Sequence, residues 1–145
     1  MVLAQLNIAK LLYPIDSPQL SEFVANLDRI NALADRSPGF IWRFPGDDEL
    51  ESHMFDDKTI VNMSTWSDTK SLHKFVFRSD HTDIMRQRES WFSPQDIYSV
   101  LWWHDSAQPP SLEQAKQKLE HLRNHGPCED AFTFRHQWPN PDLAE

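Results

Sequence analysis

Polar side chains with the spacing of a β-strand are the first candidates for chemistry in this chain. Asn62, Ser64 and Trp66 occupy alternate positions of one stretch, and Gln5 and Asn7 do the same near the N-terminus. Because successive strand residues point to opposite faces, each set shares one face. Amide and hydroxyl groups beside an indole ring can orient a carbonyl or a phenol in an apolar cavity. The same groups can instead hydrogen-bond across an interface or to buried water, and the pattern leaves both readings open.

Two other stretches supply further candidates for ligand contacts. Arg43 lies among aromatic residues in FIWRF, where its guanidinium can meet a ligand anion or pair with an acidic residue at an interface. Trp102 belongs to the apolar stretch IYSVLWW, and His104 ends it. An apolar run of this length is typical of a strand that is covered on both faces. The ligand-binding candidates are Arg43, Ser64, Trp66, Asn7, Trp102 and His104.

Histidines are considered for catalysis because an imidazole near neutrality is the usual general acid or base. His73 and His81 both lie in the helical region that follows Trp66. His81 comes directly after Asp80 at a predicted helix start, where it can equally be a solvated residue. The catalytic candidates are therefore His81 and Asn62.

No metal site is predicted. His121 and His125 have the i, i+4 spacing that can bind a metal from one helix face, but Leu122 stands where a metalloprotease motif has Glu. The pair also falls at a helix C-terminus, where imidazoles favour the dipole, so we interpret it as a surface feature. Cys128 is the only cysteine, which excludes an intrachain disulfide and a multi-cysteine metal site.

Length and charge limit the class of protein. The 145 residues fit one domain, expected to span residues 1–145. Fourteen basic residues stand against 22 acidic ones, a net charge of -8, which argues against nucleic acid and against an anionic membrane as partners. The N-terminal segment has no basic leader, and polar residues interrupt its apolar run. We therefore expect a cytoplasmic protein.

The periodicity places these candidates on a defined set of elements. Ser67 is the expected N-cap where a strand ending at Trp66 switches to helical spacing. Ser111 and Gln114 form a capping box, and Gly126 is a C-cap. Residues 47–57 are expected to be a loop or an irregular hairpin. Strands are predicted over residues 3–9, 40–44, 59–66, 97–103 and 131–136, and helices over residues 18–36, 68–78, 80–92 and 111–125.

This order predicts an α+β fold of the ferredoxin-like, split βαβ type, an antiparallel sheet with helices on one face. Val61 and Met63 are the expected partners of the helices, which would leave Asn62 and Ser64 on the helix-distal face with Trp66. That second face is too apolar for water, and a second copy of the same sheet is its simplest cover. The sequence therefore predicts a homodimer.

The pattern NMSTWSxxxSLxxF at residues 62–75 resembles the dimeric α/β-barrel superfamily, which includes antibiotic-biosynthesis monooxygenases, haem-degrading monooxygenases and muconolactone isomerases. More closely, LAQLNIA, LDRINALADRSPGFIWR, LWW and AFTFR resemble a bacterial family known as domain of unknown function 3291. The resemblance implies a dimeric α/β barrel that binds a small apolar or aromatic molecule. It implies a cofactor-independent monooxygenase or isomerase, with a non-catalytic homodimer that binds a metabolite or a protein as the alternative.

Haem is not expected as a cofactor, and no other cofactor is predicted. The haem-degrading relatives carry a Trp and a ligand His at the positions that Phe75 and Met85 hold here. Asn7 does match an Asn on their first strand, but two of the three residues are absent.

Overall fold

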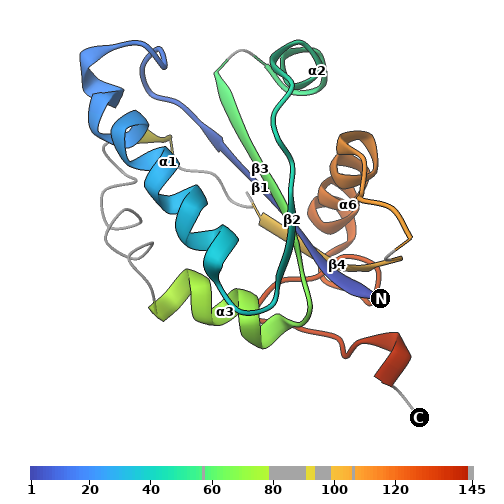
Figure 1. The fold of residues 1–145 in the computed structure, drawn as a ribbon. Helices are drawn as coiled ribbons and strands as arrows, with labels where there is room; N and C mark the ends of the chain where they lie inside the picture. Colours follow the sequence, from blue (N-terminus) through green and yellow to red (C-terminus); the bar gives the residue numbers. More distant parts are fainter. Residues whose placement is uncertain (57, 79–90, 94–98, 106, 144–145) are drawn as a thin grey trace.

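A four-stranded antiparallel sheet forms the centre of the fold, with the strand order β2-β3-β1-β4 (Figure 1). The computed structural model describes residues 1–56, 58–78, 91–93, 99–105 and 107–143. In chain order the elements are β1 (Val2–Lys10), η1 (Pro18–Leu20), α1 (Ser21–Arg36), β2 (Phe40–Arg43), α2 (Asp48–Met54), β3 (Thr59–Trp66), α3 (Thr69–Arg78), β4 (Ser99–His104), α6 (Leu112–His125) and η2 (Pro141–Leu143).

The strand order confirms the predicted ferredoxin-like α+β fold, in which the first and third strands are neighbours at the centre. β1 pairs with β3 from Leu3 to Lys10, with Leu3 opposite Trp66 and Asn7 opposite Asn62. On its other side β1 pairs with β4. The centre of the sheet is therefore the place where the polar positions of two strands lie side by side.

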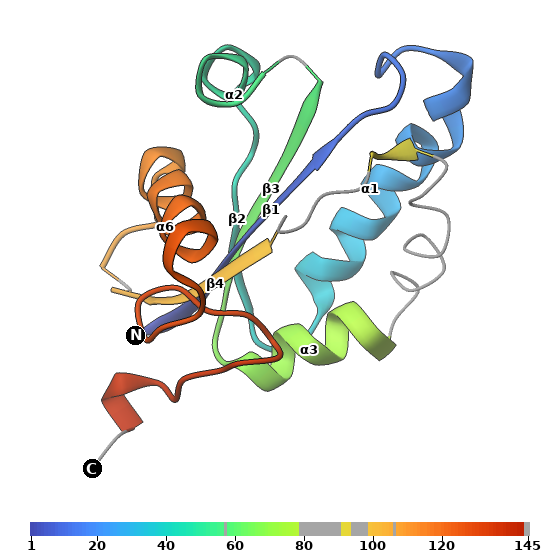
Figure 2. The same cartoon turned by 180° about the vertical axis from the view of Figure 1, so that it is seen from behind.

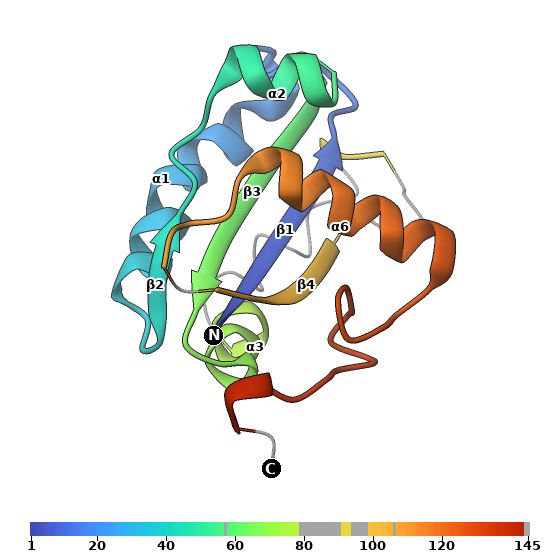
Figure 3. The same ribbon diagram turned by 90° about the vertical axis from the view of Figure 1, so that its right-hand side faces the viewer.

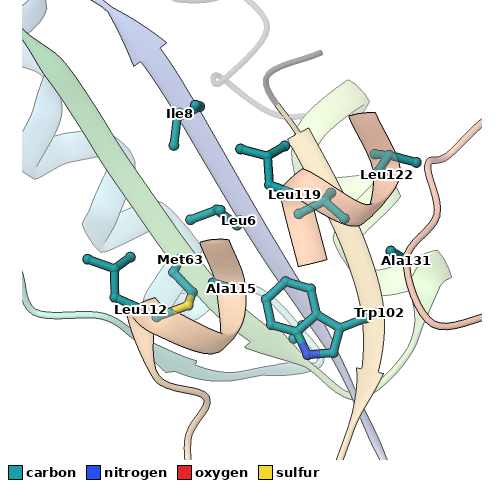
Figure 4. Close-up of a cluster of buried hydrophobic side chains, with 11 residues drawn as sticks. Leu6, Ile8, Met63, Trp102, Leu112, Ala115, Leu119, Leu122 and Ala131 are labelled. Atoms are coloured by element: carbon teal, nitrogen blue, oxygen red, sulfur yellow. The ribbon is translucent and has the colours of Figure 1, made fainter. Parts of the chain in front are cut away.

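Helices cover both faces of the sheet. Helices α1 and α3 lie on one side and α6 on the other, as Figures 1 and 2 show from opposite directions. In Figure 3, α6 crosses in front of β1 and β3. Its apolar stripe packs into one core cluster with the sheet residues that point to it (Figure 4). The buried members of that cluster are Ala4, Leu6, Ile8, Met63, Val100, Trp102, Leu112, Ala115, Leu119, Leu122 and Ala131.

The prediction that helices cover one face only is therefore wrong in this detail. The face that the sequence assigned to the helices carries α6, and the face that it assigned to a second copy carries α1 and α3. Lys116 of α6 also donates from Nζ to the carbonyl of Met54 in α2 at 2.6 Å. The apolar stripe of α6 needed a partner, and the chain itself supplies it. The homodimer stays a prediction, but the argument that a sheet face lacks a cover within the chain no longer supports it.

The assignment of the two strand faces was also wrong. Met63 packs with α6, whereas Trp66 belongs to a second buried cluster with Ala34 of α1 and Leu72 of α3. Asn62 and Ser64 therefore face α1 and α3, not the helix-distal side. Alternation showed correctly which residues share a face. It could not show which of three apolar helix stripes would take which face.

Local capping explains two further differences. Residues 48–54 form helix α2, because Asp47 accepts a hydrogen bond from the amide of Leu50 at 3.0 Å and Glu51 accepts one from the amide of Asp47 at 2.8 Å. The cap of α3 is Asp68, not Ser67: its carboxylate accepts from the amide of Ser71 at 2.7 Å. This hydrogen bond lowers the pKa of Asp68 below its usual value.

The C-terminal segment lies along β4 without forming a regular strand. Phe132 makes an isolated antiparallel bridge with Leu101, so the predicted strand at residues 131–136 is reduced to single bridges. The Ser111 cap of α6 is confirmed, since its Oγ accepts from the amide of Gln114 at 3.1 Å, and Gly126 has the expected positive φ of 76°. In the described residues, no helix is both long and apolar enough to cross a membrane.

Candidate functional site

A small pocket lies between the sheet and helices α1 and α3. Figure 1 shows these two helices on the left of the sheet. The volume of the pocket is about 40 Å³, which holds one or two water molecules. Strands β1, β2 and β3 form its floor, and α1 and α3 form its walls. The lining residues are Gln5, Asn7, Ile30, Asn31, Ala34, Phe40, Arg43, Asn62, Ser64, Trp66, Phe75 and Val76.

The floor of the pocket is polar because two strands bring their polar positions into register. Gln5 lies opposite Ser64, and Asn7 lies opposite Asn62. Gln5 and Ser64 are buried, Asn7 is half-buried and Asn62 is exposed at the edge. The Nε2 group of Gln5 donates to Oδ1 of Asn7 at 3.4 Å, a long hydrogen bond. Four neutral groups that donate and accept hydrogen bonds thus line one end of the cavity.

An indole ring separates this polar floor from the aromatic wall. Trp66 donates from Nε1 to Oγ of Ser64 at 2.9 Å. Its ring stacks on Phe75 of α3, with 5.3 Å between ring centroids and 27° between planes. Phe40 of β2 meets the same ring edge-on at 5.4 Å. Contacts on three sides therefore fix the orientation of Trp66.

Arg43 reaches the pocket, but its charge is already paired. The guanidinium donates from Nη1 to the carbonyl of Asn31 at 3.0 Å and forms an ion pair with Asp35 at 2.5 Å. The sequence left Arg43 to meet a ligand anion or an acid at an interface, and the structure pairs it with Asp35 of its own chain. The pocket is consequently close to neutral, and it suits an uncharged ligand better than an anion.

The chemistry of the described lining is limited to hydrogen bonding and packing. Arg43 is its only ionisable side chain, and no carboxylate, imidazole or thiol is among the lining residues that the structure describes. A general acid or base is thus not supplied from this set. The arrangement can orient a carbonyl or a hydroxyl group and hold a flat ring against the face of Trp66 that Phe75 now covers.

The remaining candidates do not join this pocket. Trp102 is buried in the α6 cluster, on the opposite face of the sheet, and its Nε1 has no hydrogen-bond partner in the described structure. His104, two residues further along β4, has its Nε2 2.7 Å from the carbonyl of Gln108. His73 packs against Phe77 on the surface of α3. His81 lies outside the described residues, so its role as a catalytic candidate stays a prediction.

The structure thus brings together Asn7, Arg43, Asn62, Ser64 and Trp66 of the predicted residues, with Gln5 beside them. Sequence reasoning missed the contribution of α1, which supplies Asn31. A signal for it existed. Asn31 follows Leu27 by four residues and precedes Ala34 by three. It is therefore a polar residue on the apolar stripe of its helix.

The chain belongs to the family described as Domain of unknown function (DUF3291), which matches residues 2–145. Two solved structures share its fold. One is SnoaB, a cofactor-independent oxygenase from Streptomyces nogalater, with a TM-score of 0.54, 15% identity, and coverage of 75% of this chain and 98% of that chain. The other is the NE2512 protein of unknown function from Nitrosomonas europaea, with a TM-score of 0.51, 17% identity, and coverage of 76% and 95%. No curated protein matches the chain.

Proposed function

We propose that this chain binds a small, uncharged, flat molecule with a carbonyl or phenol oxygen in the pocket between the sheet and helices α1 and α3. The observation that carries the proposal is the floor of neutral polar groups beside an aromatic wall. Gln5 and Ser64 are buried there, and the amide nitrogen of Asn7 donates to no residue that the structure describes. An oxygen atom of a ligand can accept from such a donor in place of water.

Charge and shape define the ligand class. Arg43 is already neutralised by Asp35, which favours an uncharged molecule over an anion. Phe75 stacks on the ring of Trp66, so the same face of Trp66 favours a flat ligand ring once Phe75 moves aside. These two features agree with the apolar or aromatic substrate that the family resemblance implies.

Ligand entry requires a change in the wall of the pocket. The cavity of about 40 Å³ is far below the roughly 300–1,000 Å³ typical of small-molecule sites. The sheet floor is held by backbone pairing, whereas Phe75 and Val76 lie on a single helix and are only partly buried. We therefore place the movement at the side chains of α3, and we expect binding to be slow compared with a preformed site.

A binding titration tests the proposal. The probe is 2-naphthol, a flat neutral phenol, and its fluorescence is followed as protein is added. We expect Asn7→Ala to weaken binding at least about fivefold, because a hydrogen bond of about 1 kcal/mol is lost. Asn26→Ala is the matched control, since Asn26 is half-buried on α1 outside the pocket lining and its amide donates to the carbonyl of Glu22. Equal affinity of both variants would remove the pocket from consideration.

A second candidate function is oxygenation of the bound molecule without a cofactor. It is favoured by the fold shared with SnoaB and by a described lining without an acid–base group, which suits a substrate that ionises by itself. In such a reaction a methylene and O₂ give a ketone and water, and the substrate supplies all the electrons. Anthrone, which enolises readily, is a suitable probe in an oxygen electrode. Oxygen uptake no faster than the protein-free rate would leave the chain as a binding protein.

Self-association is the remaining part of the proposal. Helix α6 covers much of the second sheet face, but Ile41 on the edge strand β2 is 50% exposed beside the half-buried Trp42 and Phe44. We propose that two copies associate along this edge. Light scattering at micromolar concentration should give about twice the chain mass of 17.0 kDa. A stable species at the mass of one chain would contradict this.

A further inference from the structure

Two histidines face each other on the last turn of α6, far from the pocket described above. His121 and His125 are one helical turn apart, and the centroids of their rings are 4.8 Å apart with an interplanar angle of 41°. Both side chains are exposed. Neither imidazole makes a hydrogen bond with any residue that the structure describes. Their ring nitrogens are therefore available to a ligand from solvent.

The separation of the rings matches that of two imidazoles on one metal ion. A metal–nitrogen bond of about 2.0–2.1 Å puts the ring centroid about 3.2 Å from the metal, so an N–metal–N angle of about 90–110° separates two centroids by about 4.5–5.2 Å. The observed 4.8 Å falls inside this range. The separation of the two rings is thus compatible with chelation of one ion by both imidazoles.

The backbone around the pair is fixed and its field is favourable. Leu119 and Leu122 bury the opposite side of the helix against the sheet, so this turn is held by the core. The helix ends at His125, where Gly126 closes it with a hydrogen bond to the carbonyl of Leu122. The negative end of the helix dipole and a chain net charge of -8 both favour a cation here.

We propose that His121 and His125 form a two-histidine site for a divalent transition-metal ion, with water in the remaining coordination positions. Among the residues that the structure describes, no group of three or more His, Cys, Asp or Glu side chains could hold a metal. The site is therefore exchangeable, not structural. Imidazole ligands bind Cu²⁺ most tightly in the first-row series, ahead of Ni²⁺ and Zn²⁺.

A copper titration of the untagged protein tests this inference. CuCl₂ is added in a non-chelating buffer, affinity is measured by calorimetry, and the number of bound nitrogens is read from the electron paramagnetic resonance spectrum. We expect one ion per chain with two coordinating nitrogens. His121→Ala and His125→Ala should each weaken this site at least about tenfold, because the second ligand acts at an effective concentration in the millimolar range.

The matched controls are His53→Ala and His136→Ala, which remove exposed histidines elsewhere on the surface. Each should leave the two-nitrogen signal and its affinity within about twofold of the parent. A melting-temperature increase in CuCl₂ that both α6 variants lose and both controls keep would support the site independently. If His121→Ala leaves affinity unchanged, or if the spectrum shows one nitrogen only, the inference is wrong.

Discussion

Trp66 donates its indole N–H to the hydroxyl of Ser64, two residues earlier on the same strand, at 2.9 Å. Both side chains are buried, so the indole ring and the hydroxyl fix each other on the floor of the pocket. The hydroxyl accepts from the indole and keeps its own proton for another acceptor. This relationship links the stability of the sheet to the polarity of the candidate site.

The Ser64–Trp66 pair should show strong energetic coupling. Ser64→Ala leaves a buried indole N–H without an acceptor, which costs about 1–3 kcal/mol in the free energy of unfolding. Trp66→Phe costs more, because ring volume is lost as well. The double variant should be more stable than the sum of the two single changes predicts, by at least about 0.5 kcal/mol. Urea denaturation of all four proteins measures this, and additive effects would mean that the hydrogen bond contributes nothing.

Phe75 should control access to the pocket. Phe75→Ala removes part of the α3 wall and should strengthen binding of 2-naphthol, since the ligand no longer has to displace the ring. We expect a loss of no more than about 3 kcal/mol in the free energy of unfolding, because the side chain is only partly buried. Phe77→Ala, on the same helix but 53% exposed, is the control and should not change affinity. Weaker binding by Phe75→Ala would instead assign that ring to ligand stacking.

Gly39 should be intolerant of any side chain. Its φ is 88°, and a Cβ there would lie 2.5 Å from Cβ of Ser71 at the start of α3. Gly39→Ala should therefore cost more than about 2 kcal/mol in the free energy of unfolding. Gly46→Ala is the comparison. Gly46 has a similar φ of 98°, but a Cβ there would lie 3.9 Å from its nearest neighbour, a carboxylate oxygen of Glu51. The difference between the two variants in thermal denaturation isolates the contact with α3.

Asp68 should make α3 sensitive to acid. Its folded-state pKa is lowered, chiefly by the hydrogen bond from the amide of Ser71, so its contribution is complete above the unfolded pKa of about 3.9. That contribution is lost as the pH falls through the lower folded-state pKa. Asp68→Asn can still accept this hydrogen bond but has no charge to lose, so its stability should depend less on pH between pH 5 and pH 3, a range of about two units. Denaturant titrations at both ends of this range compare the two proteins, and parallel losses would contradict the assignment.

Much of the fold follows from clear local patterns in the sequence. The alternation in residues 59–66 predicted β3, the Ser111 cap predicted the start of α6, and Pro18 marks the first helical turn after β1. These features depend on neighbouring residues alone, which is why sequence reasoning finds them.

The candidate site was predicted less well, because long-range packing decides which helices cover which face of the sheet. Alternation grouped Asn62 with Ser64 and Trp66, and the structure keeps them together. Which helices lie above them depended on α6, whose leucines compete for the same sheet. The pairing of Arg43 with Asp35 joins β2 to the preceding helix, and no local pattern favoured that acid over the others.

Because helices cover both faces of the sheet, the two sides of the protein can have separate roles. The pocket side chains and the α6 cluster lie on opposite faces of the sheet, so substitutions on the two sides should have nearly additive effects on stability. Selection can then reshape the pocket for a new ligand while the α6 side preserves a foldable chain. Members of one family can in this way share an unchanged half and differ freely in what the other half recognises.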